Sequence, residues 1–403
     1  MPSGPAEPHL IDPAGCVLSR RGALLLAAGG LAQLSLPPAA PPAPAGRAAD
    51  QRAEVTQLLA ARARSLPAWS GLTGAEALYR NLVLSSDQGS SAVDGPDRLT
   101  ASAELAVRIV GYDEYPVVYP RRIALVRDAG GWRVEREEAA SGPPALWDLG
   151  PARTAPGEHC LVQGLAEGPD PAGLVAVGDK AVPAVSAVWG GGWPGRLLLE
   201  LPADETQFAR LLEADPAGWT GMAAVTVAAP GAPWHTPADR VVVNPDAFGR
   251  LSDFGRQVVV THEATHVATR ADTRAWTPLW LSEGVADWTA YRDSGRRPQQ
   301  IAPELTRDVT AGKPPTALPA DRDFTAGASG IAQAYEQSWL ACDLIARRWG
   351  PDRLVAFYRA VGAGDGQGED RDHRIDRLLR GELGVGSAEF TALWLTEVSA
   401  LKG

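Results

Sequence analysis

Residues 254–270, FGRQVVVTHEATHVATR, place a His-Glu-x-x-His pattern on an expected helix. The apolar run 258–260 leads into it, and helical residues four positions apart lie on one face. The imidazoles of His262 and His266 can therefore reach one metal ion. Glu263 lies one step round the helix, where its carboxylate can face water at an open coordination position. The alternative is a pair of solvated histidines on an ordinary helix.

A second segment, WTPLWLSEGVADW at 276–288, supplies two carboxylates. A catalytic zinc site uses three protein ligands and one open position, and two histidines with one carboxylate are a standard set. Glu283 is the expected third ligand, on a helix that packs across the first. Asp287 lies four residues further on the same face, where it can accept a hydrogen bond from a ligand imidazole. The alternative for Asp287 is an exposed helical acid.

The order HExxH followed by WLSEGxAD resembles the gluzincin metallopeptidases, the thermolysin- and aminopeptidase-like group. It is most similar to the small peptidase-MA-like domains of secreted actinobacterial proteins, and the resemblance covers residues 240–355. It implies that the two histidines and Glu283 bind one Zn²⁺ per chain, that Glu263 is the general base, and that Asp287 orients a ligand. The interval between His266 and Glu283 is shorter than in the best-known members of this group. The difference affects how the two helices pack, and not which residues bind the metal.

The same resemblance implies two further features of the cleft. The strand from Val241 to Asn244 would lie along it, so that Val242 and Asn244 bind an extended peptide substrate. The helix expected at 331–349 would carry Tyr335, whose hydroxyl would stabilise the oxyanion. The alternative for Tyr335 is an ordinary core or boundary tyrosine.

The rest of the chain predicts an α+β protein in two parts. In the first, helices precede strands that flank the turn 128–131, an arrangement that resembles a nuclear-transport-factor-2-like (NTF2-like) α+β cone; any small α+β domain is the alternative. We place this domain at 50–140 and a gluzincin-type domain, with a short β-sheet and a mostly helical C-terminal part, at 150–403. Expected helices are 50–64, 75–82 and 206–214, and expected strands are 105–109, 123–127, 132–137, 160–164, 173–177 and 196–201.

Residues 1–45 have the pattern of a signal peptide. Arg20 and Arg21 precede the modest apolar run 22–36, and Ala43-Pro44-Ala45 suits signal peptidase. The arginine pair is typical of twin-arginine export, although Gly22-Ala23 replaces the usual bulky residue. The run is too short to span a membrane comfortably. We therefore expect a secreted or cell-envelope protein without a membrane span after cleavage; a disordered tail or an uncleaved anchor is the alternative.

Composition excludes several classes of protein. The 403 residues leave room for two or three domains, and the net charge of −10 argues against a general nucleic-acid binder. Cys16, Cys160 and Cys342 are too few for a disulfide scaffold and too scattered for a cysteine zinc cluster. The sequence thus favours an exported zinc metallopeptidase that acts on a peptide or protein. The alternatives are a non-peptide zinc hydrolase, and a catalytically weak ligand-binding protein whose metal is structural.

Overall fold

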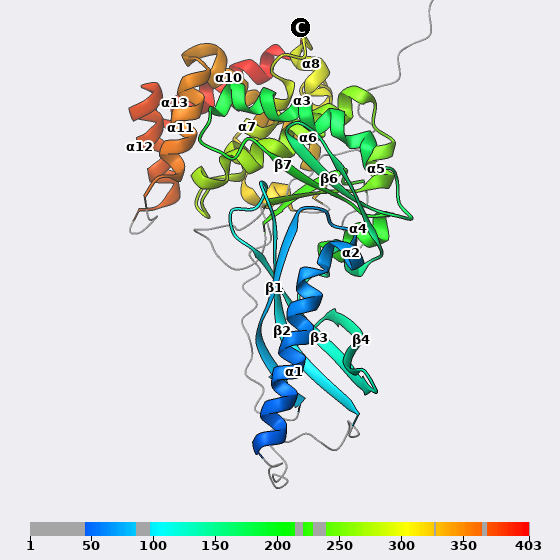
Figure 1. Ribbon diagram of the computed structural model, residues 1–403. Helices are drawn as coiled ribbons and strands as arrows, with labels where there is room; N and C mark the ends of the chain where they lie inside the picture. Colours follow the sequence, from blue (N-terminus) through cyan, green and yellow to red (C-terminus); the bar gives the residue numbers. More distant parts are fainter. Residues whose placement is uncertain are drawn as a thin grey trace, which may run out of the picture.

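The chain folds around two β-sheets in a computed structural model that describes residues 45–85, 97–213, 221–228, 239–325, 328–364 and 369–402. Figure 1 shows one sheet with a long helix as the lower body, and the second sheet with most helices above it. The predicted signal peptide, residues 1–45, lies outside the described residues except for Ala45, which begins the first helix.

The lower body is a four-stranded antiparallel sheet in the order β1-β2-β3-β4. Helix α1 packs on it and buries Val55 and Leu59 against Leu99 and Ile123. The elements of this body are α1 (Ala45–Arg64), α2 (Leu66–Ser70), β1 (Ala75–Leu84), β2 (Arg98–Ile109), β3 (Val117–Asp128) and β4 (Gly131–Ala139). One long helix and an antiparallel sheet agree with an α+β domain, and the nuclear-transport-factor-2-like cone stays a prediction.

The predicted helix 75–82 is wrong, because this segment forms β1. Its side chains alternate between the half-buried and exposed faces from Ala75 to Tyr79, which is the period of a strand. The alternation shifts at a bulge between Arg80 and Val83, where Asn81 has a φ of 54°. Because the second half of β1 is irregular, its sequence does not show the alternation of a strand over the full length.

The second sheet has the order β5-β6-β7-β9-β8. Strands β6, β7 and β9 are parallel, whereas β5 and β8 are antiparallel to their neighbours and form the edges. Its strands are β5 (Ala152–Pro156), β6 (Cys160–Leu165), β7 (Leu197–Leu201), β8 (Ala224–Ala228) and β9 (Asp239–Val243).

The predicted strand 173–177 is also wrong, since it belongs to helix α3 (Ala172–Trp189). Parallel strands need a crossover, and α3 supplies the one between β6 and β7. Among the described helices, α3 alone is long and apolar enough to cross a membrane; here Ala181, Val182 and Val185 are buried on its packed side. That side contacts β6 and α6.

The remaining helices belong to the upper body, and all of them except α4 follow the second sheet in the chain (Figure 1). They are α4 (Glu205–Leu211), α5 (Pro245–Gly249), α6 (Asp253–Thr269), α7 (Leu279–Tyr291), α8 (Pro298–Ile301), α9 (Pro303–Thr310), α10 (Ile331–Trp349), α11 (Pro351–Gly362), α12 (Arg371–Leu383) and α13 (Ser387–Ala400). Short 3₁₀ turns cover Leu146–Asp148, Arg270–Asp272 and Asp321–Phe324. The two cysteines among the described residues, Cys160 on β6 and Cys342 on α10, are buried free thiols.

A buried interface joins the two bodies. Leu105 and Val107 of β2 pack against Leu161 and Leu198 of the second sheet. The guanidinium of Arg240 on β9 donates to both carboxylate oxygens of Asp113, at 2.6 and 2.9 Å. The second sheet therefore has α3 and α6 on one face and the lower body on the other.

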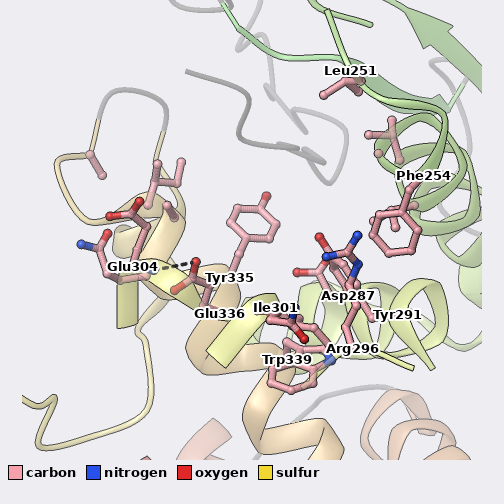
Figure 2. Close-up of a pocket in the computed structure, with 18 of the residues that line it drawn as sticks. Leu251, Phe254, Asp287, Tyr291, Arg296, Ile301, Glu304, Tyr335, Glu336 and Trp339 are labelled. Carbon is pink, nitrogen blue, oxygen red and sulfur yellow. Dashed lines mark hydrogen bonds between the residues drawn. The ribbon is translucent and has the colours of Figure 1, made fainter. Parts of the chain in front are cut away.

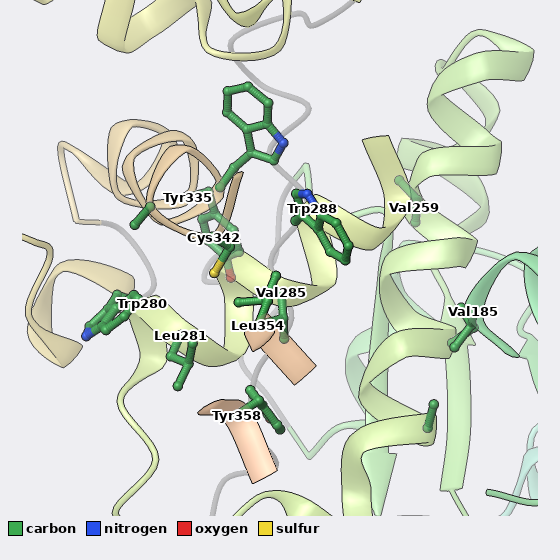
Figure 3. Packing of buried hydrophobic residues seen from close by; sticks show 14 of the residues in the cluster. Val185, Val259, Trp280, Leu281, Val285, Trp288, Tyr335, Cys342, Leu354 and Tyr358 are labelled. Atoms are coloured by element: carbon green, nitrogen blue, oxygen red, sulfur yellow. The ribbon is translucent and has the colours of Figure 1, made fainter. Parts of the chain in front are cut away.

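Helices α7 and α10 pack at backbone distance. A Cβ built on Gly284 would lie 2.4 Å from the carbonyl oxygen of Ser338 and 2.7 Å from Sγ of Cys342. Figure 3 shows α7 residues such as Val285 and Trp288 beside Tyr335 and Cys342 of α10. This close approach fixes α7, and with it the carboxylates that α7 carries.

Candidate metal centre

Helix α6 carries the His-Glu-x-x-His pattern into the interior. The Ser252 side chain caps its N-terminus by accepting a hydrogen bond from the amide of Gly255, at 3.1 Å. Every residue from Val258 to Thr269 is buried, between α3, α7 and the second sheet. The histidines are therefore not a solvated pair on an ordinary helix.

Helix α7 brings its carboxylates to the same place. Pro278 precedes its first turn, and Glu283 and Asp287 follow one turn apart on one face. The glutamate is fully buried, and Asp287 is 8% exposed. Asp287 is therefore not an exposed helical acid.

Three potential ligand atoms converge between the two helices. Nε2 of His262 lies 3.1 Å from Nε2 of His266, and Oε2 of Glu283 lies 3.4 and 3.3 Å from these two nitrogens. The structure thus brings together the three residues that the sequence predicts as metal ligands. His266 is the most exposed of them, at 8%, so the group is reached from its side.

The spacing of these atoms fits a zinc ion. Zinc bonds of about 2.0–2.1 Å place the ligands of a tetrahedral site about 3.3–3.4 Å apart. The observed separations of 3.1, 3.3 and 3.4 Å lie close to this value. Neither carboxylate oxygen of Glu283 has a hydrogen-bond partner among the described residues, although both are buried. A buried carboxylate left in this way is stabilised by a cation, so the donor set suits a metal.

Asp287 orients the first of these histidines. Nδ1 of His262 lies 2.8 Å from Oδ1 of Asp287, so the protonated Nδ1 donates to the carboxylate. This tautomer leaves the lone pair of Nε2 directed at the other two ligand atoms. The arrangement is the one that the sequence predicts for Asp287.

Glu263 lies beside the ligand group and is held from an unexpected direction. The hydroxyl of Thr226 on β8 donates to Oε2 of Glu263 at 2.6 Å, and it lies 3.1 Å from the backbone oxygen of the same residue. Oε1 of Glu263 is buried and has no hydrogen-bond partner among the described residues. One oxygen is thus fixed while the other stays available. The sequence analysis missed Thr226, since only the pairing of β8 with β9 brings it here.

The two glutamates of the site have pKa values shifted in opposite directions. Burial raises the pKa of Glu263 above its usual value. Burial also acts to raise the pKa of Glu283, but the neighbouring His266 and His262 outweigh it and lower that pKa to about 2. Burial disfavours a charged His262, yet the carboxylate of Asp287 raises the pKa of that histidine well above its usual range. Glu283 is therefore the more readily ionised of the two glutamates, and Glu263 is the more easily protonated one.

Tyr335 lies beside the ligand group on the first turns of α10. Its ring centroid is 6.2 Å from that of His262 and 5.3 Å from that of Phe324, and the residue is 5% exposed. Figure 2 shows its hydroxyl pointing into a cavity of about 350 Å³ that Asp287 also lines. This position agrees with a role of the Tyr335 hydroxyl in oxyanion stabilisation. The role itself stays a prediction.

Val242 and Asn244 do not lie on a substrate-binding edge, which corrects the sequence prediction. Strand β9 is inside the sheet, where Val242 is paired with Glu200 of β7 on one side and Val225 of β8 on the other. The side chain of Asn244 accepts hydrogen bonds from the amides that begin α5. Neither residue can pair with an extended peptide. The edge belongs to β8, which precedes β9 in the chain.

Comparison with known proteins adds weak likenesses only. No family model and no curated protein matches this sequence. A mutant M1 zinc metallopeptidase from Deinococcus radiodurans bound to a Tyr-Ser-Ala substrate is 16% identical, with a TM-score of 0.37 over 67% of this chain and 58% of that one. A mutant two-domain M1 zinc metallopeptidase bound to L-arginine is 13% identical, with a TM-score of 0.38 over 76% of this chain and 90% of that one. This chain thus spans 58% of the length of the former.

Proposed function

We propose that this protein is a zinc-dependent peptidase that hydrolyses peptide bonds with Glu263 as the general base. The observation that supports this most strongly is the buried convergence of His262, His266 and Glu283 at tetrahedral spacing, with the available Oε1 of Glu263 beside it. A bound zinc ion would supply Lewis-acid polarisation of the scissile carbonyl and a water of lowered pKa.

Three side chains would carry out proton transfer, positioning of the base and stabilisation of the oxyanion. Glu263 takes the proton from the attacking water and delivers it to the leaving nitrogen, for which its raised pKa is suited. The hydrogen bond from Thr226 holds one oxygen of this base, so the carboxylate rotates little between the two transfers. The hydroxyl of Tyr335 would donate to the substrate oxygen as negative charge develops on it.

The sheet edge favours a peptide over other amides and esters. Strand β8 pairs with β9 on one side, and its other edge has no strand partner among the described residues. Thr226 of β8 contacts Glu263, so a peptide added to this edge as a further strand would pass the general base. An ester or small amide would make no use of such an edge.

A purely structural metal is the second hypothesis, and Glu263 argues against it. A structural zinc site is closed by four protein ligands, whereas three converge here in the described residues. The buried carboxylate of Glu263 beside an incomplete ligand set lowers the stability of the fold, and a purely structural metal site does not require it.

Export is part of the proposal and is supported by the sequence of residues 1–45. Cleavage after Ala45 would leave Gly46 as the first residue of the mature chain, one residue into α1. N-terminal sequencing of the protein recovered from its source would find Gly46. An intact Met1 on membrane-bound material would instead indicate an anchor.

The experiment that tests the chemistry compares Glu263→Gln with Asp253→Asn. Asp253 is a fully exposed acid in the first turn of the same helix, so it controls for loss of charge on α6. With a peptide library as substrate, Glu263→Gln should keep its zinc and lose roughly 10²–10⁴-fold in turnover. Asp253→Asn should cleave as the wild type does. Wild-type turnover in Glu263→Gln would contradict the mechanism.

A further inference from the structure

The cavity beside the metal centre has walls suited to a large substrate side chain. It extends for about 350 Å³ from Asp287 and Tyr335 between the first half of α6, the end of α7 and the start of α10. Apolar groups form much of the lining: Leu251, Phe254, Val258, Ile301, Ile331 and Trp339. Figure 2 shows Phe254 and Trp339 on different sides of this space. Two of its lining residues, Asp287 and Tyr335, also contact His262 of the ligand group.

Arg296 is the one basic residue in the described lining of this cavity. Its guanidinium carbon lies 4.2 Å from the centroid of the Phe254 ring, a cation–π contact that places the group over an apolar wall. The side chain is half-buried, and no carboxylate of the described residues forms an ion pair with it. The pocket therefore presents a cation whose charge is not neutralised.

The acids that line the cavity all have partners of their own. Asp287 accepts from His262. Glu336 accepts from the amides of Leu305 and Glu304, at 2.6 and 3.2 Å, and burial raises its pKa to about 8, so it is mostly neutral at pH 7. Glu304 pairs with Arg307 on the outer side of α9. Each acid of the described lining thus has a hydrogen-bond or ion-pair partner of its own, and none of them pairs with Arg296.

We propose that this cavity binds the substrate residue next to the scissile bond and that Arg296 pairs with a carboxylate on that residue. The inference rests on the proposed peptidase function, which it extends to a substrate class. Methylene groups of the bound residue would contact the apolar walls, while its carboxylate reaches the planar guanidinium in a bidentate pair. The carboxylate can belong to an acidic side chain or to a free C-terminus.

The test compares matched peptides on the zinc-loaded protein. One pair differs by Glu against Gln at the residues flanking the cleaved bond, and the other by a free against an amidated C-terminus. The variants are Arg296→Met, which keeps length and removes charge, and Arg292→Met as the control. Arg292 stacks on Trp288 close by and does not line this cavity. Kd for the same peptides is measured on the zinc-loaded Glu263→Gln protein, with and without Arg296→Met.

The wild type should favour the carboxylate peptide of one pair by roughly 10- to 100-fold in kcat/KM, the effect of one hydrogen-bonded charge. Arg296→Met should lose this preference and cleave the neutral peptide normally, and Arg292→Met should behave as the wild type. The pair that responds identifies the source of the carboxylate.

Failure of this inference can be told from failure of the proposed function. Cleavage without a carboxylate preference, or a preference that survives in Arg296→Met, overturns the pocket and leaves the peptidase. Binding that depends on Arg296 without any cleavage by the wild type supports the pocket and overturns the peptidase. Absence of both cleavage and Arg296-dependent binding overturns the inference.

Discussion

Replacing Gly284 by alanine should separate α7 from α10 and weaken zinc binding. The new Cβ would lie 2.4 Å from the carbonyl oxygen of Ser338. That oxygen belongs to the backbone of α10 and cannot rotate away, so the helices must move apart by roughly 1 Å to reach ordinary contact. Glu283 is the preceding residue, and the movement displaces its carboxylate from the two histidines.

The magnitude follows from comparison with a second glycine. Overpacking of this kind costs about 1–3 kcal/mol, while alanine in place of a helical glycine gains about 1 kcal/mol. Gly381 on α12 is exposed, and a Cβ there meets nothing within 4 Å, so Gly381→Ala has the same gain without the clash. We therefore expect Gly284→Ala to have a free energy of unfolding about 1–3 kcal/mol below that of Gly381→Ala.

Urea unfolding of the metal-free proteins measures this difference, and competition with a chelator measures zinc affinity. The affinity should fall at least roughly tenfold in Gly284→Ala, as for lost support of a ligand, and stay constant in Gly381→Ala. A Gly284→Ala protein as stable as Gly381→Ala, with unchanged zinc affinity, would refute the packing argument.

Three further substitutions test the surroundings of the metal centre. Thr226→Val removes the hydroxyl that holds Glu263 and should lower kcat about tenfold with zinc content unchanged, while Thr226→Ser restores kcat; equal rates in both would show that the contact is incidental. Asp287→Asn should weaken zinc affinity about 10- to 100-fold, because a neutral amide replaces the charged carboxylate that accepts from Nδ1 of His262, and unchanged affinity by chelator competition would exclude that role. Tyr335→Phe should keep zinc and fold but lose about 10²–10³ in kcat with little change in KM, and an unchanged kcat would make Tyr335 a packing residue.

The parts of the site that are local in sequence could be predicted from it. His262 and His266 share a helix face, and Glu283 and Asp287 share another, so the 3.6-residue period places each pair. The packing of α6 against α7 follows from their apolar faces, although the sequence does not show that Gly284 lets α7 approach α10 closely. The structure brings together the predicted ligands for these reasons.

The parts that depend on strand pairing could not be predicted. The position of β8 outside β9 is a matter of sheet order, which places Thr226 against Glu263 and buries Val242 between two strands. A run such as 173–177 has no period that separates strand from helix, and the crossover requirement of a parallel sheet decides it. The role proposed for Arg296 depends on the cavity, which helices far apart in the sequence enclose.

The zinc content of the purified protein and of three single variants shows whether His262, His266 and Glu283 bind the metal. Wild-type protein, dialysed against metal-free buffer, should hold about one zinc ion per chain, and His262→Ala, His266→Ala and Glu283→Ala should each hold far less, because three ligands are the minimum for such a site. Gly381→Ala, purified in the same way, should match the wild type. A His266→Ala protein that retains a full equivalent of zinc, or a wild type that binds none, would show that these three residues are not the ligands of a zinc site.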